Sequence, residues 1–486
     1  MRIFLGTMLC ATAMLGQGGG HVQFRDWSVP AGGARPKATC GSLQSLTDYE
    51  MSVTSAKVVA ATADMPEHCR VHVLIQPKLN IEVNLPAAWN GRFYMFGNGG
   101  FAGESFDSAG RMTDLRRGLK AGFAVASTDT GHAAAEEPGG SFAKSRQELV
   151  DFAFRAVHLT AETAKTVIRA YYGDGPTKSY FDGCSQGGRE GLILAQRFPK
   201  DFDGIIAGSP TMDFTHGNFA RAYWMQGLAA APVAAAKMKL LADTIYAKCD
   251  EKDGVKDGVI DDPQRCEFHP ATDLPRCAEG SGGASCFTGA EIGSLERIYG
   301  DVMSQGKKMF PGWPVGSEIT PEGGRSGWVG QELNGADGKP GAWTYYAADV
   351  LRYMAFPETD PATTIAGFDV NRDPQRLVWL SDMIDAVDPD LSEFRKHDGK
   401  LIMYFGWADP QLNPQAGVDY YESVRARMGA GTEDFARLFM VPGMFHCGGG
   451  VGPNVFDVET PLIQWVEQGK PPDGITASRV VGGNVV

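Results

Sequence analysis

Residues 181–188 read Phe-Asp-Gly-Cys-Ser-Gln-Gly-Gly and contain the pattern Gly-x-Ser-x-Gly at 183–187. In proteins with this pattern, a strand turns sharply into a helix and leaves the serine oxygen exposed above a sheet. The flanking residues agree, because 178–181 are strand-like and 189–198 have the apolar spacing of a helix. The segment predicts a strand-to-helix turn above an α/β sheet, with Ser185 as the candidate nucleophile; the alternative is an ordinary glycine turn.

Apolar strand-like runs lie on both sides of this segment. Runs at 71–75, 92–96 and 123–127 precede it, and a helical pattern spans 152–172. Such alternation indicates a mostly parallel sheet covered by helices. Later runs, at residues 401–406 and 436–441, have the same strand-like character. The sheet is therefore predicted to be interrupted and then resumed.

The interruption has a different composition. With 486 residues, the chain exceeds the size at which one core stops growing. The intervening residues are rich in glycine, proline and tryptophan, as loops of an inserted lid would be. The predicted organisation is a signal peptide at 1–18, a catalytic domain at 19–212 and 399–486, and a lid domain at 213–398.

The first residues have the layout of a secretory signal. Arg2 precedes an apolar stretch at 3–15, and small and polar residues follow. This predicts a secreted or periplasmic protein; the alternative is an N-terminus that is apolar by chance. No later stretch is long and apolar enough to cross a membrane. The net charge of −13 argues against a nucleic-acid partner.

Removal of the signal would delete Cys10 and leave eight of the nine cysteines. An even number in an exported chain suggests four disulfides, although eight cysteines permit 105 pairings. The alternative is a set of free buried thiols in a cytosolic enzyme. Proximity in the sequence favours the pairs Cys249–Cys266 and Cys277–Cys286, then Cys40–Cys69, which leaves Cys184 with Cys447.

A candidate base and acid follow the two late strands. In hydrolases of this sheet type the order along the chain is nucleophile, acid, base. His446 lies in a glycine-rich loop at 442–450, and Asp409 lies just past the strand at 401–406. Asp388 and Asp390 are weaker candidates for the acid because they precede that strand. A structural histidine and a simple Asp-Pro turn are the alternatives.

An oxyanion hole needs two hydrogen-bond donors. The backbone N–H of Gln186 is the first candidate, because it follows the serine. The glycine loop after the strand at 92–96 offers Gly99 or Gly100 as the second, unless that loop is only a flexible turn.

Residues 250–262 carry several carboxylates in a short glycine-containing loop. Clustered carboxylates suit a hard cation, and calcium accepts oxygen ligands in flexible geometry. The spacing is not that of an EF-hand, and a solvated acidic turn is the alternative. The predicted structural calcium site would use carboxylates of Asp250, Asp253 and Asp257 and backbone carbonyls of Val255 and Val259.

From about Cys40 to Pro472 the chain resembles the tannase and feruloyl esterase family, which includes mono(2-hydroxyethyl) terephthalate hydrolases. The resemblance is carried by residues 181–188 and 441–450, the acidic segment 249–263 and Gly-Trp-Ala-Asp-Pro at 406–410. It implies an exported α/β-hydrolase with a lid, and the catalytic and calcium residues named above. It also implies a disulfide between Cys184 and Cys447.

The implied reaction is hydrolysis of an ester of a hydroxycinnamic, gallic or phthalate-type acid. The substrate could be attached to plant cell-wall polysaccharide or to a polyphenol. Trp313 and Trp328 could stack on an aromatic ring and Arg325 could hold a carboxylate or phenol, although lid packing and a solvated charge are the alternatives. Two rival hypotheses are a thiol hydrolase using Cys184 and a calcium-dependent carbohydrate-binding protein on an inactive hydrolase fold.

Overall fold

The computed structural model describes residues 20–21, 33–318, 327–328, 333, 340–481 and 484–485. The predicted signal segment and Arg325 lie outside these residues. The centre of the molecule is a nine-stranded sheet in the order β12-β11-β8-β7-β5-β6-β4-β3-β2. Its strands are β2 (Met51–Val59), β3 (His68–Ile75), β4 (Leu79–Pro86), β5 (Arg92–Phe96), β6 (Ala124–Thr128), β7 (Lys178–Cys184), β8 (Gly204–Gly208), β11 (Lys400–Gly406) and β12 (Ala436–Val441).

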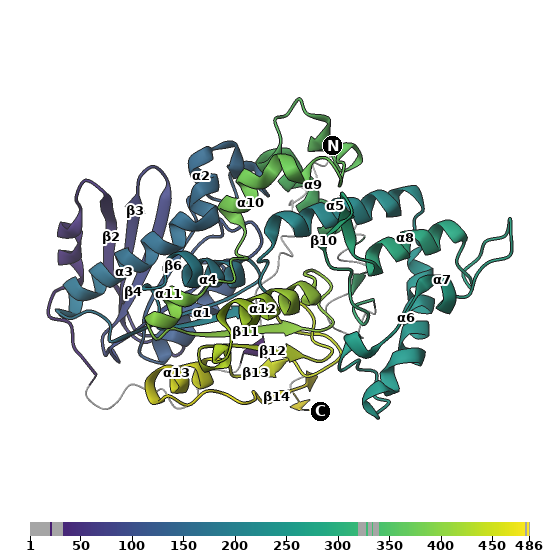
Figure 1. Ribbon diagram of the computed structural model, residues 1–486. Coiled ribbons are helices and arrows are strands. Elements are labelled where there is room, and N and C mark those ends of the chain that lie inside the picture. Colours follow the sequence, from purple (N-terminus) through teal and green to yellow (C-terminus); the bar gives the residue numbers. More distant parts are fainter. Residues whose placement is uncertain are drawn as a thin grey trace, which may run out of the picture.

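The sheet is parallel over most of its width. Every neighbouring pair from β12 across to β6 is parallel. Strands β6, β4, β3 and β2 then pair antiparallel, and β2 and β3 stand at the left of Figure 1. The α/β-hydrolase type with a mostly parallel sheet is therefore confirmed, and an antiparallel extension is added to it.

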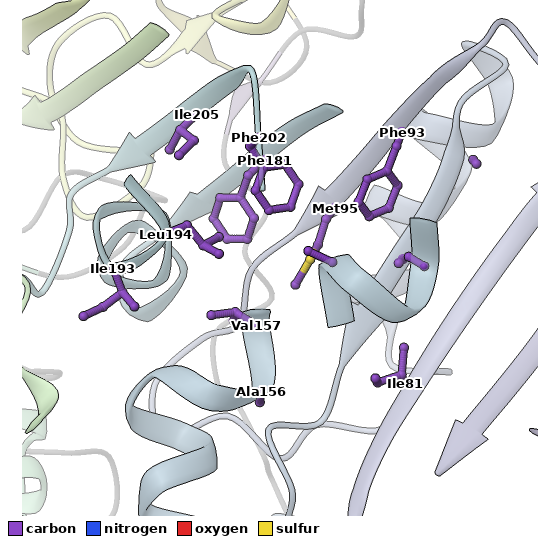
Figure 2. Packing of buried hydrophobic residues seen from close by; sticks show 14 of the residues in the cluster. Ile81, Phe93, Met95, Ala156, Val157, Phe181, Ile193, Leu194, Phe202 and Ile205 are labelled. Carbon is purple, nitrogen blue, oxygen red and sulfur yellow. The ribbon is translucent and has the colours of Figure 1, made fainter. Parts of the chain in front are cut away.

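Helices cover both faces of the sheet because its central strands are apolar on both sides. In β5, Phe93 and Met95 join the core that contains α3 (Ala156–Tyr172) and α4 (Gln186–Arg197). Figure 2 shows both side chains in the same cluster as Phe181 of β7, and the strand register sets Met95 opposite Phe181. The alternate residues Tyr94 and Phe96 join the opposite core, with α1 (Ala109–Lys120) and α13 (Glu459–Gln468). Period-two alternation thus places each side chain in one of two cores.

The chain leaves the sheet after β8 and returns at β11. Among the described residues of this long connection, no strand joins the central sheet, and β9 (Val302–Ser304) and β10 (Lys307–Phe310) form a separate hairpin. A tryptophan-rich core lies in this connection. The helices are α5 (Phe214–Ala230), α6 (Ala235–Cys249), α7 (Pro270–Asp273), α8 (Gly289–Tyr299), α9 (Ala342–Asp349), α10 (Val378–Ile384) and α11 (Ser392–Lys396).

The remaining α-helices and β-strands are one long helix that packs into the core with α3 and α4, and several short segments. They are α2 (Arg146–Val150), α12 (Pro414–Met428), β1 (Gly20–His21), β13 (Val455–Phe456), β14 (Ala477–Ser478), β15 (Val480–Val481) and β16 (Asn484–Val485). In the part of the chain that the structure describes, no helix combines the length and the apolar character needed to span a membrane.

Candidate active site

Ser185 occupies the sharp turn between β7 and α4. Its backbone has φ 64° and ψ −119°, a left-handed conformation that is uncommon for any residue with a side chain. The turn brings strand and helix into contact, since a Cβ added to Gly183 would lie 2.5 Å from the carbonyl carbon of Gly187. Residues with side chains persist in such strained conformations where the surroundings enforce them, and active sites are frequent examples.

Two neighbouring strands deliver the acid and the base. Asp409 follows β11 and His446 follows β12, so both lie at the carboxyl edge of the sheet. Nδ1 of His446 lies 2.8 Å from Oδ2 of Asp409, and both residues are buried. The other carboxylate oxygen accepts hydrogen bonds from the backbone N–H groups of Gln411 (2.9 Å) and Leu412 (3.0 Å). The carboxylate is therefore held in place on both oxygens.

Ser185 and His446 line the same cavity, which has a volume of about 710 Å³. Gly99 and Gly100, from the loop after β5, line it as well. The candidate nucleophile, base and glycine donors are thus brought to one cavity by segments that are far apart in the sequence. Gln186 directly follows the serine as the first residue of α4.

The structure contains all four disulfides, with the pairing that sequence proximity favoured. The bond between Cys184 and Cys447 joins residues 263 positions apart, with their Cα atoms at 6.0 Å. Because its sulfur is in this bond, Cys184 offers no thiolate, which argues against the thiol hydrolase hypothesis. The other bonds are Cys40–Cys69, Cys249–Cys266 and Cys277–Cys286.

The two tryptophans proposed to stack on substrate are packing residues in this structure. Trp328 is fully buried and donates Nε1 to Oγ of Ser317 at 2.8 Å. Trp313 is also buried and donates Nε1 to the backbone oxygen of Asp409 at 3.2 Å. Their large apolar rings are removed from water by the tryptophan-rich core rather than by a ligand.

Other aromatic side chains stand at the cavity. Tyr345 and Tyr346 of α9 line it together with Phe101, and Phe101 contacts both tyrosine rings. Nothing in the sequence distinguishes these two adjacent tyrosines from the buried tryptophans. Only the placement of α9 over the cavity makes the distinction.

The predicted calcium loop begins in a short 3₁₀ turn, Asp250–Asp253, and is closed by the bond between Cys249 and Cys266. Burial raises the pKa of Asp261, and the nearby charges of Asp253 and Asp257 raise it further. The negative charges of Asp253 and Asp257 thus disfavour ionisation of Asp261, and clustered oxygen donors of this kind are the type that calcium accepts. The proximity of Asp261 to Asp253 and Asp257 was not predicted from the sequence.

A second group of possible metal ligands lies outside the cavity that Ser185 and His446 line. Among the described residues, the ligating atoms of Asp213, His216 and Asp385 lie within 4.8 Å of one another. Although burial lowers the pKa of His216, a 2.8 Å bond to Asp213 raises it to about 9. Asp385 accepts bonds from the backbone N–H and hydroxyl of Thr215. These bonds tie down the first turn of α5, so the group acts as a helix cap.

Comparison with known proteins identifies the relatives of this chain. A family model described as tannase and feruloyl esterase matches residues 63–484. A mono(2-hydroxyethyl) terephthalate hydrolase of Piscinibacter sakaiensis is 32% identical, with 87% of this chain and 80% of the relative covered. A probable feruloyl esterase B-2 of Aspergillus terreus is 29% identical, with 95% and 86% covered.

Solved structures agree with this result. Feruloyl esterase B from Aspergillus oryzae superposes with a TM-score of 0.77 at 25% identity, covering 92% of this chain and 94% of that one. A tannin acyl hydrolase from Aspergillus niger, at 22% identity, a TM-score of 0.69 and coverage of 90% and 89%, shares the fold. An inactive carbohydrate-binding protein is not favoured. The chain belongs to the tannase and feruloyl esterase family and is a carboxylic ester hydrolase.

Proposed function

We propose that this protein is an exported serine esterase that hydrolyses esters of aromatic acids through an acyl-enzyme intermediate. One observation carries the proposal: the strained Ser185 lines the same cavity as His446, and Nδ1 of His446 is hydrogen-bonded to Asp409. Serine becomes a useful nucleophile only when a base accepts its proton and a third group orients that base. The arrangement supplies each of these parts.

In the proposed reaction, Ser185 Oγ attacks the ester carbonyl and His446 Nε2 accepts the proton. An ionised carboxylate can only accept hydrogen bonds, so the Nδ1 atom facing Asp409 carries the hydrogen and Nε2 is left as the base. The N–H groups of Gln186 and of Gly99 or Gly100 bind the oxyanion. His446 then returns the proton to the departing alcohol, and water releases the acyl group by the same steps.

The cavity supports an aromatic acyl group. Its wall includes Phe101, Tyr345 and Tyr346, and aromatic rings favour offset or edge-on contact with one another. Hydroxycinnamic, gallic and phthalate-type acids all present such a ring, and the alcohol could be a polysaccharide or polyphenol. Export is supported by the four disulfides, which persist in oxidising compartments. We also assign the segment between β8 and β11 as the lid.

Turnover of a small panel tests the function. The purified protein is given methyl ferulate, chlorogenate, methyl gallate and a monoalkyl terephthalate, and acid release is followed by chromatography. We expect hydrolysis of at least one ester, and the ratio of kcat/KM values ranks the acyl groups. A folded, calcium-loaded protein that releases no acid from any of the four would contradict the proposal.

We further propose that the loop carrying Asp250, Asp253, Asp257 and Asp261 binds a structural calcium ion, with backbone carbonyls of Val255 and Val259 as added ligands. When bound, calcium would neutralise the repelling carboxylates and hold the loop in a single conformation. Asp250 already accepts a bond from the backbone N–H of Gly258 at 2.9 Å, so part of the loop is ordered by its own contacts.

Calcium removal is expected to lower thermal stability. A ligand present at about 100 times its Kd stabilises the folded state by about 2.7 kcal/mol, which corresponds to several degrees in Tm. We expect EGTA to lower the Tm of the wild type, and Asp257→Asn to have a low Tm with or without calcium. Asp243→Asn, an exposed carboxylate on α6, is the control. Equal Tm values for the wild type in calcium and in EGTA would rule the site out.

A further inference from the structure

We propose that Glu190 is a positioning residue that fixes the loop of residues 97–100, here called the oxyanion loop, against α4. The inference rests on the proposed esterase function, in which one oxyanion donor is the Gln186 N–H and the other belongs to Gly99 or Gly100. These donors come from different segments of the chain. Their separation therefore depends on what holds the segments together, and donors must lie about 2.7–3.1 Å from the oxyanion to be effective.

Glu190 holds Asn98, the residue that precedes the glycines, at two points. Its Oε2 accepts the backbone N–H of Asn98 at 3.0 Å, and its Oε1 accepts the side-chain Nδ2 at 2.9 Å. Both residues are 1% exposed, so water does not compete for these bonds. The backbone oxygen of Asn98 in turn accepts the N–H of Gly187 at 2.7 Å. Asn98 is thus bound three times to the helix that begins beside Ser185.

A cation, Arg111, fixes which way the Asn98 amide points. Arg111 of α1 donates Nη2 to Oδ1 of Asn98 and also to the backbone oxygen of Thr128, at 2.8 Å for the latter. The amide oxygen therefore faces Arg111 and the amide nitrogen faces Glu190. Because each group has a single compatible orientation, a carboxylate at position 190 suits this site and an amide does not.

The oxyanion loop packs tightly against α4. A Cβ added to Gly97 would lie 2.6 Å from Cα of Gly187 and 2.9 Å from Oε2 of Glu190. The backbone of the loop therefore rests directly on α4, and the Glu190 carboxylate sets the spacing at the point of contact. Glu190 does not line the cavity that contains Ser185, so we assign it no direct contact with the substrate.

Glu190→Gln tests the inference directly. Its amide nitrogen would face the amide nitrogen of Asn98, and flipping Asn98 would instead turn its nitrogen toward Arg111. Removal of one oxyanion donor costs about 10²–10³ in kcat, so a displaced donor is expected to cost about 10- to 100-fold. KM should change by less than about twofold, since only the transition state carries the oxyanion. A boronic acid inhibitor mimics the tetrahedral intermediate, so its affinity should fall in parallel with kcat.

A double variant separates positioning from simple loss of stability. In Asn98→Asp with Glu190→Gln, the glutamine nitrogen donates to the new carboxylate, which still accepts from Arg111, while the glutamine oxygen accepts the backbone N–H. Each single variant lacks this complementarity, and Asn98→Asp alone sets two carboxylates against each other. We expect kcat of the double variant to return to within about threefold of wild type, the usual signature of coupled neighbours.

The control is Glu291→Gln, which removes a buried carboxylate on α8 that pairs with Lys237 away from the cavity. It should change Tm but not kcat. Wild-type kcat in Glu190→Gln, or a folded double variant that stays impaired, would overturn the inference while leaving the esterase assignment standing. If Glu190→Gln does not fold, the double variant alone decides. Absence of turnover by the wild type would overturn both proposals.

Discussion

Ser185→Ala is expected to lower kcat for an aromatic ester by at least about 10⁴-fold, because the acyl-enzyme cannot form without the serine oxygen. The fold should persist, since alanine removes one oxygen from a turn that is held by backbone bonds. The N–H of Ser185 donates to the oxygen of Gly208, and its carbonyl accepts from Thr211. Steady-state kinetics with methyl ferulate measures the loss, and circular dichroism checks the fold.

A serine outside the cavity provides the comparison. Ser392→Ala, at the start of α11, is expected to keep wild-type kinetics. If Ser185→Ala retained more than a few per cent of wild-type kcat on a freshly purified sample, another group would be the nucleophile. The same outcome would remove the basis for the roles of His446 and Asp409.

Breaking the disulfide between Cys184 and Cys447 is expected to have the second largest effect on activity. Each cysteine is the direct neighbour of a catalytic candidate, so the bond fixes the distance between Ser185 and His446. A misplacement of about 1 Å can cost about 10²-fold in rate. We therefore expect Cys184→Ala with Cys447→Ala to lose about 100-fold or more in kcat. The bond also closes a loop of 263 residues, for which chain entropy predicts about 5 kcal/mol of stability.

A second disulfide serves as the control that separates an effect on the catalytic site from a general loss of stability. Cys277–Cys286 spans only nine residues in the segment between β8 and β11. Replacing both of these cysteines by alanine should cost less stability and leave kcat near the wild-type value. Full kcat in the folded Cys184 and Cys447 double variant would contradict a positioning role for their bond.

The strands that the sequence identifies are those with continuous apolar runs. β5 occurs at the predicted residues and β11 begins one residue before them, since burial on both faces of a parallel sheet requires apolar side chains at nearly every position. β8 was not identified, because Gly204–Gly208 is short and bounded by glycines, which are typical of turns. β4 was missed as well. Its Glu82 and Asn84 suggest exposure, yet both are buried, and Glu82 pairs with Arg70.

Some residues of the candidate site could also be predicted from the sequence, and others could not. Asp409 and His446 could be predicted because each follows a recognisable strand, and parallel neighbours end at one edge of the sheet. Asp390, a weaker candidate for the acid, instead pairs with Arg427. For Trp313 and Trp328 the sequence left both packing and stacking open, because an aromatic residue gives the same pattern whether it packs in a core or contacts a ligand. The structure shows them packed.

Two carboxylates, Glu190 and Asp261, had no distinctive signal in the sequence. Glu190 lies in a helical pattern where a carboxylate normally faces solvent, and only the close approach of the oxyanion loop buries it. Asp261 lies at the end of an acidic run in which every carboxylate is equivalent by spacing. Its proximity to Asp253 and Asp257 arises only in the folded loop. Both cases depend on contacts that become visible only in three dimensions.

Covalent labelling tests the central claim most directly. The wild-type protein is treated with a p-nitrophenyl alkylphosphonate, which phosphonylates an activated serine irreversibly, and the modified peptide is located by mass spectrometry. We predict one phosphonyl group per chain, placed on Ser185, with esterase activity lost in proportion to labelling and no label in Ser185→Ala. Labelling at a different residue, or full activity after stoichiometric modification of Ser185, would contradict the account.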